Sequence, residues 1–160
     1  MLLRVLYYTV WDGRCCRGTD MELFSIGQMT TILSMNPDKV KNWMAGKPFK
    51  FVPSAQAGSG KGSRHIYNRQ DLYLLGIANE LSKAGFAGKA IGGLLKAIGP
   101  KLARLPRSAS MKVWRVKPGA PFHVTVGRAK PEGITLWHVL EVGTLMRAID
   151  DAVRKLESGK

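Results

Sequence analysis

The stretch FSIGQMTTILSMNPDKVKNWMAGK, residues 24–47, predicts two short helices separated by a tight turn. Over the first helix, apolar residues recur at helical intervals, at Ile26, Met29, Ile32 and Leu33. Ser25 stands just before this run, where its hydroxyl can accept from an unpaired backbone N–H and cap the helix. The helix should break at residues 34–37, because the residue before a proline is pushed out of the α region.

The second short helix should begin with Pro37 in its first turn and Asp38 near its positive end. Its apolar side consists of Val40, Trp43 and Met44. Lys39 and Lys41 should remain outside that side. A short helix that packs across another and carries outward lysines is suited to the major groove of DNA.

The residues after this pair predict a wing, which is two strands joined by a basic loop. Residues 49–52 should form the first strand, closed by Pro53, and residues 65–67 the return strand. Between them, residues 54–63 are small and glycine-rich around Lys61. Such a loop can lie along the phosphate backbone, where it fixes register and supplies affinity without reading sequence.

The stretch GSRHIYNRQDLYLLGIANELSKAGFAGKAIGGLLKAI, residues 62–98, completes the unit with two further helices. Asn68 can cap a long helix over residues 68–82, and Asp71 supplies an acid to its first turn. A second helix follows and should stop at Gly99-Pro100. We interpret the leucines of both helices as core.

This stretch resembles the DNA-binding domain of the mercury-resistance regulator (MerR) family, a winged helix-turn-helix. The resemblance covers about half of the chain. It rests on five short motifs in order: Ser25-Ile26-Gly27-Gln28-Met29, Val40-Lys41-Asn42-Trp43, Arg64 with Tyr67, Asp71-Leu72, and Ala84-Gly85-Phe86. Thr30, Ser34 and Lys41 depart from the residues usual in the family, which are alanine, glycine and arginine. The resemblance implies a transcriptional regulator that dimerises through a C-terminal coiled coil.

On this interpretation, specific residues should contact double-stranded DNA. The candidates for the major groove are Lys39, Lys41 and Asn42. The candidates for phosphate contacts are Lys61, Arg64 and Tyr67 in the wing, with Arg69 as a weaker one.

The charge of the chain favours a polyanionic partner. Its 160 residues carry a net charge of +14, and at 45% hydrophobic residues they can build a core. Residues 39–69 hold seven basic residues and no acid. Nucleic acid is therefore the first expectation, ahead of an anionic membrane surface or a merely solvated basic face. No apolar run approaches the roughly 20 residues that span a bilayer.

We expect four parts: an N-terminal extension (residues 1–20), the winged unit (21–99), a basic linker (100–110) and a C-terminal part (111–160). Residues 1–20 are expected to be a poorly ordered tail, and Met21 is an alternative start. Their adjacent Cys15 and Cys16 give neither a disulfide framework nor a metal site. Gly58 to Ser63 is similar to a phosphate-binding loop, but Ala55 and Gly62 stand where its glycine and hydroxyl should be, so we reject nucleotide binding.

The C-terminal part predicts a β-hairpin followed by one amphipathic helix over residues 136–158. Residues 113–116 and 122–126 should form the hairpin strands. The helix carries apolar residues spaced 3, 4, 3, 4 and 3 apart, which is a coiled-coil seam: Val139, Val142, Met146, Ile149, Val153 and Leu156. The seam must be buried against the hairpin or against a second copy, and the family resemblance favours a homodimer.

The predicted fold is therefore mainly α with small β: a winged helix-turn-helix of four short helices and a two-stranded wing, then a β-hairpin and a C-terminal helix. The predicted function is sequence-specific binding of double-stranded DNA by a cytoplasmic, nucleoid-associated regulator that acts as a homodimer, without a cofactor or metal. Two alternatives remain open: an architectural DNA-binding protein of the excisionase type, and a protein-interaction or ligand-sensing module. An enzyme is not expected, because none of the three histidines stands in a recognisable pairing with a nucleophile or carboxylates.

Overall fold

In the computed structural model, residues 22–55, 65–106, 108–115, 120, 122–127 and 135–159 are described. The predicted N-terminal extension, with Cys15 and Cys16, lies outside these residues. In chain order the elements are β1 (Leu23–Phe24), α1 (Ile26–Ile32), α2 (Pro37–Met44), β2 (Tyr67–Asn68), α3 (Arg69–Lys83), α4 (Gly88–Leu102), β3 (Met111–Arg115), β4 (His123–Val126), β5 (Thr135–Leu140) and α5 (Val142–Glu157). β1 and β2 form one antiparallel sheet and β4-β3-β5 the other. The expectation of helices combined with small β-structure is confirmed at this level.

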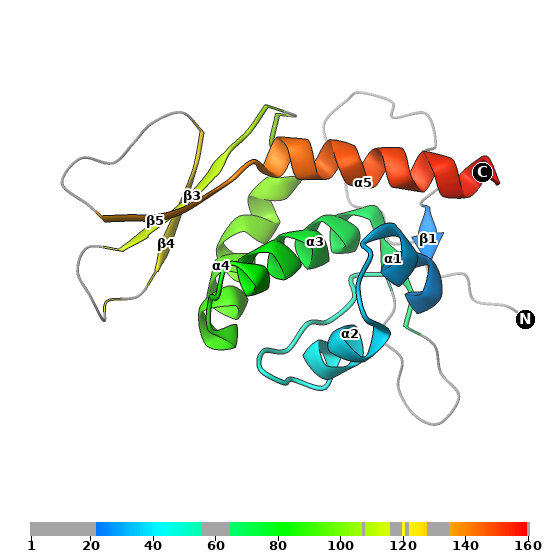
Figure 1. Ribbon diagram of the computed structural model, residues 1–160, viewed down its shortest axis with the longest axis horizontal. Helices are drawn as coiled ribbons and strands as arrows, with labels where there is room; N and C mark the ends of the chain where they lie inside the picture. The colour runs from blue at the N-terminus through cyan, green and yellow to red at the C-terminus, as the bar shows by residue number, and fades with distance from the viewer. Residues whose placement is uncertain are drawn as a thin grey trace, which may run out of the picture.

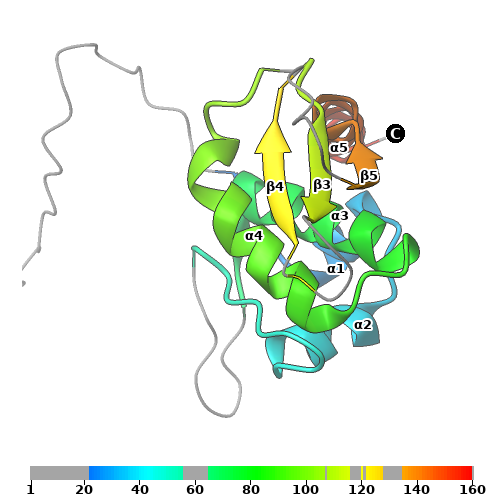
Figure 2. The same cartoon turned by 90° about the vertical axis from the view of Figure 1, so that its left-hand side faces the viewer.

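Helix α3 lies at the centre of the molecule, and α1, α4 and α5 pack around it (Figure 1). Nine of its fifteen residues are buried, so most of its surface is covered by the rest of the chain. The three-stranded sheet sits at one end, in front of the helices in Figure 2. One hydrophobic cluster joins the helices to this sheet, from Phe24 to Val153.

The first two helices begin where the sequence predicts. Ser25 caps α1 in a capping box with Gln28, and the Asn36 side chain accepts from the backbone N–H of Asp38 to cap α2. Between the helices, Ser34 adopts a left-handed backbone conformation with φ of 48°. This is the position where the resembled family has glycine, and a side chain there costs conformational energy.

The first arm of the predicted wing is not a strand, since residues 49–53 form no ladder. Phe51 instead donates its backbone N–H to the carbonyl of Trp43 at the end of α2. Phe49 packs on the Trp43 ring with centroids 5.0 Å apart. Both phenylalanines are buried, which a strand would also give because residues two apart share one face; the strand is excluded by the missing ladder and not by burial. The predicted return strand survives in part as β2, which pairs with β1.

Helix α4 runs three residues further than predicted. Pro100 lies inside its last turn, where it leaves the carbonyl of Lys96 without the usual intrahelical donor. Gly99 lacks the Cβ that would clash with the proline ring in the α conformation. Leu102 is fully buried, and Gln70 donates its side-chain amide to the Gly99 carbonyl at 3.2 Å. Tertiary packing therefore outweighs the local stop signal, and residues 100–102 are not a linker.

The C-terminal part confirms the hairpin and corrects the helix. Strands β3 and β4 pair as predicted, but residues 135–140 form a third strand, β5, on the other side of β3. This segment is rich in β-branched and aromatic residues, a composition typical of strands. Helix α5 therefore begins at Val142 rather than at residue 136.

The apolar stripe of α5 is buried inside its own chain. Val142, Met146, Ile149 and Val153 are at most 4% exposed, and α5 packs on α3 and α1. A Cβ built on Gly76 of α3 would lie 2.9 Å from the Ile149 side chain, so this glycine permits the close approach of the two helices. Of the six predicted dimerisation residues, only Val139, which belongs to β5, and Leu156 are exposed. The prediction that this seam joins two copies is wrong, because α3 already occupies it.

Candidate nucleic-acid interface

Helix α2 presents a polar surface opposite its buried side. Val40 and Trp43 are at most 3% exposed and hold the helix against the core. Lys41 and Asn42 are exposed on the other side, as the sequence predicts. The Lys41 ammonium lies 3.2 Å from the Asp38 carboxylate, but both side chains are largely exposed. Such a pair contributes little stability, so Lys41 remains available to an external anion.

Lys39, predicted to be outward, instead joins α2 to α3. Its Nζ donates to Asn79 Oδ1 at 2.9 Å and lies 5.1 Å from the centre of the Trp43 ring. Burial lowers the pKa of Lys39, and nearby Lys83 lowers it further, while Glu80 acts in the opposite direction. The prediction of a major-groove contact from Lys39 is therefore corrected, because its ammonium is committed within the chain.

Two of the four candidates for phosphate contacts, Tyr67 and Arg69, lie within the described residues. Lys61 and Arg64 lie outside the described residues. Tyr67 is fully buried and donates its hydroxyl to the thioether sulfur of Met44 at 2.7 Å. Burial raises the pKa of Tyr67 to about 12, and the Asp71 carboxylate adds to this shift. A phosphate contact from Tyr67 is therefore wrong, because no phosphate can reach its hydroxyl.

Arg69 is likewise committed to internal ion pairs. Its guanidinium contacts the Glu22 carboxylate and lies 3.1 Å from Asp150 on α5. Burial acts to lower the pKa of Arg69, but the hydrogen bond that Arg69 donates to Glu22 and the charges of Glu22, Tyr73 and Asp150 together outweigh burial, so the pKa is raised. Asp150 also accepts a hydrogen bond from the Tyr73 hydroxyl. Arg69 therefore stabilises the junction of β1, α3 and α5, and its assignment as a DNA contact is corrected.

Asp71 has a structural role that its sequence position only partly indicates. Its fully buried carboxylate accepts from the backbone N–H and hydroxyl of Ser54, at 2.9 and 2.6 Å, and from the Asn68 backbone N–H at 3.0 Å. These bonds fix residues 54 and 68, which are on either side of the predicted wing loop. The sequence indicates the capping of α3, but the bonds to Ser54 depend on the tertiary fold.

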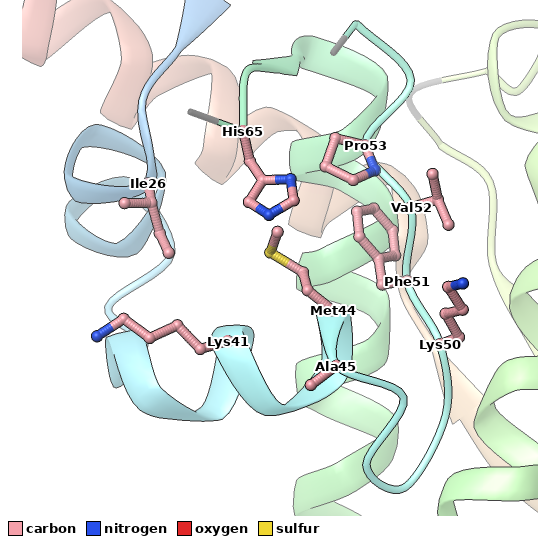
Figure 3. A pocket seen from close by; sticks show the side chains of 9 residues that line it. All are labelled: Ile26, Lys41, Met44, Ala45, Lys50, Phe51, Val52, Pro53 and His65. Atoms are coloured by element: carbon pink, nitrogen blue, oxygen red, sulfur yellow. The ribbon is translucent and has the colours of Figure 1, made fainter. Parts of the chain in front are cut away.

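A groove of about 500 Å³ lies beside the C-terminal end of α2 (Figure 3). Met44 and His65 face each other at its centre, and Lys41 and Lys50 lie on opposite sides of it. Most of its remaining lining is apolar, from Ile26, Ala45, Phe51, Val52 and Pro53. A rim of two lysines around an apolar floor is suited to an anionic partner at the surface rather than to an enclosed ligand.

A second groove, of about 450 Å³, adjoins the first and lies between residues 48–50 and α4. Lys50 lines both grooves, and Lys89 and Lys96 of α4 line the second. Lys89 and Lys96 are seven residues apart, so they share one face of the helix. Gly92 and Gly93 lie between them, which leaves the helix backbone accessible. All three lysines are exposed.

The basic surface that we define from these grooves consists of Lys41, Lys50, Lys89 and Lys96. Of these four lysines, only Lys41 is predicted from the sequence as a candidate. The apolar residues of α4 indicate core, but the absence of any acid between residues 81 and 131 is a signal in the sequence for the lysines of α4.

The chain matches no protein-family model and no curated protein sequence. In the described part of the chain, no helix has the length and apolar character to cross a bilayer. The same residues hold no cluster of three or more His, Cys, Asp or Glu side chains that could bind a metal ion.

Proposed function

We propose that this protein is a sequence-specific, double-stranded DNA-binding transcriptional regulator with a winged helix-turn-helix architecture. In this proposal α2 enters the major groove, with Lys41 and Asn42 directed at the DNA. The protein would act in the cytoplasm, associated with the nucleoid.

The observation that carries the proposal is the basic surface beside α2. Its lysines extend from α2 through residue 50 to α4, and Lys50 belongs to both grooves. Lysines placed on either side of a groove-reading helix can neutralise phosphates on the two edges of the major groove. The net charge of +14 supports the same partner through counterion release.

The burial of the α5 seam favours a second candidate, an architectural factor of the excisionase type. A regulator that acts as a homodimer would need to associate through another surface. A protein that binds as a monomer can instead occupy repeated sites in one direction and bend the DNA between them.

Selection of bound fragments from random duplex DNA, at a stated salt concentration, tests both candidates. A two-fold symmetric site supports the dimeric regulator, and direct repeats support the architectural factor. Sedimentation of the protein with and without the selected site measures its oligomeric state. Failure to bind any duplex at low salt would overturn the proposal.

The residue-level test compares Asn42→Ala with Lys50→Ala. Asn42→Ala should change which bases are preferred, since an amide can pair with base edges. Lys50→Ala should weaken binding to all sequences alike and flatten its salt dependence, because a phosphate contact reads no bases. The reverse pattern would contradict the placement of α2 in the groove.

A further inference from the structure

The β4-β3-β5 sheet has one face against the helices and one face away from them. Met111 and Val113 of β3 are fully buried, so the alternate residues Lys112 and Trp114 lie on the opposite face. The strand register extends this face to the neighbouring strands, where Lys112 pairs with Thr125 and Val139, and Trp114 pairs with His123. We call these five residues the outer sheet face.

The inner side of the sheet is anchored by aromatic packing. The Phe86 ring, in the turn between α3 and α4, lies 5.0 Å from the Phe122 ring and 5.9 Å from the His138 ring, centroid to centroid. With Met111 and Val113 in the same hydrophobic cluster as the helices, the sheet is fixed on the helical core. The helical core behind the sheet therefore holds the outer face in place. Figure 2 looks toward the end of the molecule where the sheet lies.

Two flat rings are held together on the outer sheet face. The Trp114 ring stacks on the His123 ring, with centroids 4.6 Å apart and planes inclined by 24°. The Trp114 Nε1–H donates to the Thr125 hydroxyl at 2.7 Å, which fixes the orientation of the indole. His123 is exposed and Trp114 is partly exposed. A planar partner could therefore extend this stack without rearrangement of the strands.

The charge of this region selects the class of partner. Residues 81–131 contain eleven lysines and arginines and no acid, and they include β3 and β4 entirely. Among the described side chains of the outer sheet face, Val139 is the one large apolar residue that is markedly exposed. An ordered aromatic pair in basic surroundings is suited to unpaired nucleobases with their phosphates, because every base has a π-face. Duplex DNA hides its bases in the stack and cannot use the rings in this way.

We propose that the outer sheet face binds single-stranded nucleic acid by stacking bases on the Trp114–His123 pair. This site is separate from the basic surface beside α2 and goes beyond the proposed duplex-binding function. Trp114 and His123 supply the stacking surface.

The test is fluorescence anisotropy of a labelled oligothymidylate of twelve nucleotides, titrated with the full chain at low salt. The unmodified protein should bind it, and Trp114→Ala should lose about 5- to 150-fold in affinity, which corresponds to the contribution of about 1–3 kcal/mol from stacking one base. Trp114→Phe retains a ring and should lose less. An abasic oligomer of the same length and charge should bind the unmodified protein much more weakly than the thymidylate.

Lys41→Ala is the matched control, since it should weaken duplex binding and leave oligothymidylate binding unchanged. Trp114→Ala should show the opposite pattern, so failure of this site is distinguishable from failure of the proposed function. If Trp114→Ala does not fold, as judged by circular dichroism, His123→Ala and the abasic oligomer serve in its place.

Three results would each overturn the proposal. The first is no binding of oligothymidylate, and the second is equal binding of the thymidylate and abasic oligomers, which would mean charge attraction alone. The third is concentration-dependent dimerisation that Trp114→Ala abolishes, which would mean that a second copy covers this face.

Discussion

Helices α4 and α5 are similar in length and both pack on α3, but their exposed surfaces differ in charge. The charged residues of α4 are Lys89, Lys96 and Lys101, all basic. Helix α5 carries three basic residues and three acids: Arg147, Arg154, Lys155, Asp150, Asp151 and Glu157.

Two of the three acids of α5 are paired within the protein. Asp151 contacts Arg154 on the same helix, and Asp150 accepts from Tyr73 and contacts Arg69. On α4 the lysines have no acid on their own helix to balance them. The comparison teaches that the regular apolar seam of α5 predicts burial within the chain, whereas the one-sided charge of α4 is the basis for the proposed duplex partner.

Ile149→Ala should produce the largest effect and tests whether α5 belongs to the core. Ile149 is 3% exposed and packs against Gly76, so its truncation should lower the free energy of unfolding by about 2–5 kcal/mol in urea denaturation. Leu156→Ala is the control, because Leu156 is 38% exposed and its truncation should lower the free energy of unfolding far less. A shift in the monomer–dimer equilibrium without loss of stability would restore the seam as an interface between copies.

Tyr67→Phe tests whether the wing tyrosine is buried, as the structure places it, or available to DNA. The folded pKa is about 12 and the ordinary value is 10.0, so the unfolded chain releases this proton first as pH rises. The contribution of Tyr67 to the free energy of unfolding is complete below pH 10. At pH 11 this free energy should be lower by about 1.4 kcal/mol. Urea unfolding at pH 9, 10 and 11 should show this loss in the unmodified protein and less of it in Tyr67→Phe. The same pH dependence in both proteins would contradict the burial of the hydroxyl.

The double substitution of Lys89→Ala and Lys96→Ala tests the α4 side of the comparison directly. Loss of two phosphate contacts should weaken duplex binding about tenfold. It should also reduce the slope of log binding constant against log salt concentration by about 2 in magnitude. The matched control is Arg154→Ala with Lys155→Ala on α5, which removes the same charge from a helix surface that also carries acids. Equal losses in the two double variants would mean that net charge, rather than the α4 surface, drives binding.

Ser34→Gly should give the smallest effect, with a gain in stability below about 1 kcal/mol. Ser34 has positive φ in the turn between α1 and α2, and glycine adopts this conformation without steric strain. Part of the gain is offset by the greater freedom of glycine in the unfolded chain. Thermal unfolding measures the change, and Thr31→Gly in α1 is the control, which should be destabilised. Destabilisation by Ser34→Gly would contradict the left-handed turn.

Local chemistry made much of this fold predictable from the sequence. The caps at Ser25 and Asn68, the break at Pro37 and the β3–β4 hairpin depend on neighbouring residues, and the structure has each of them. The outward position of Lys41 also follows from helical spacing alone. These features need no long-range contact, because a cap or a proline acts within one turn of the chain.

The sequence alone therefore determined the existence and order of most helices, the hairpin and the basic character of the chain. Only the tertiary structure decided that α3 fills the α5 seam and that Lys39, Tyr67 and Arg69 turn inward. It also decided that Lys50 connects the groove at α2 with the groove lined by Lys89 and Lys96. The physical reason is that periodicity specifies which face of an element is apolar, but burial requires a partner. That partner is selected by packing among segments far apart in the sequence.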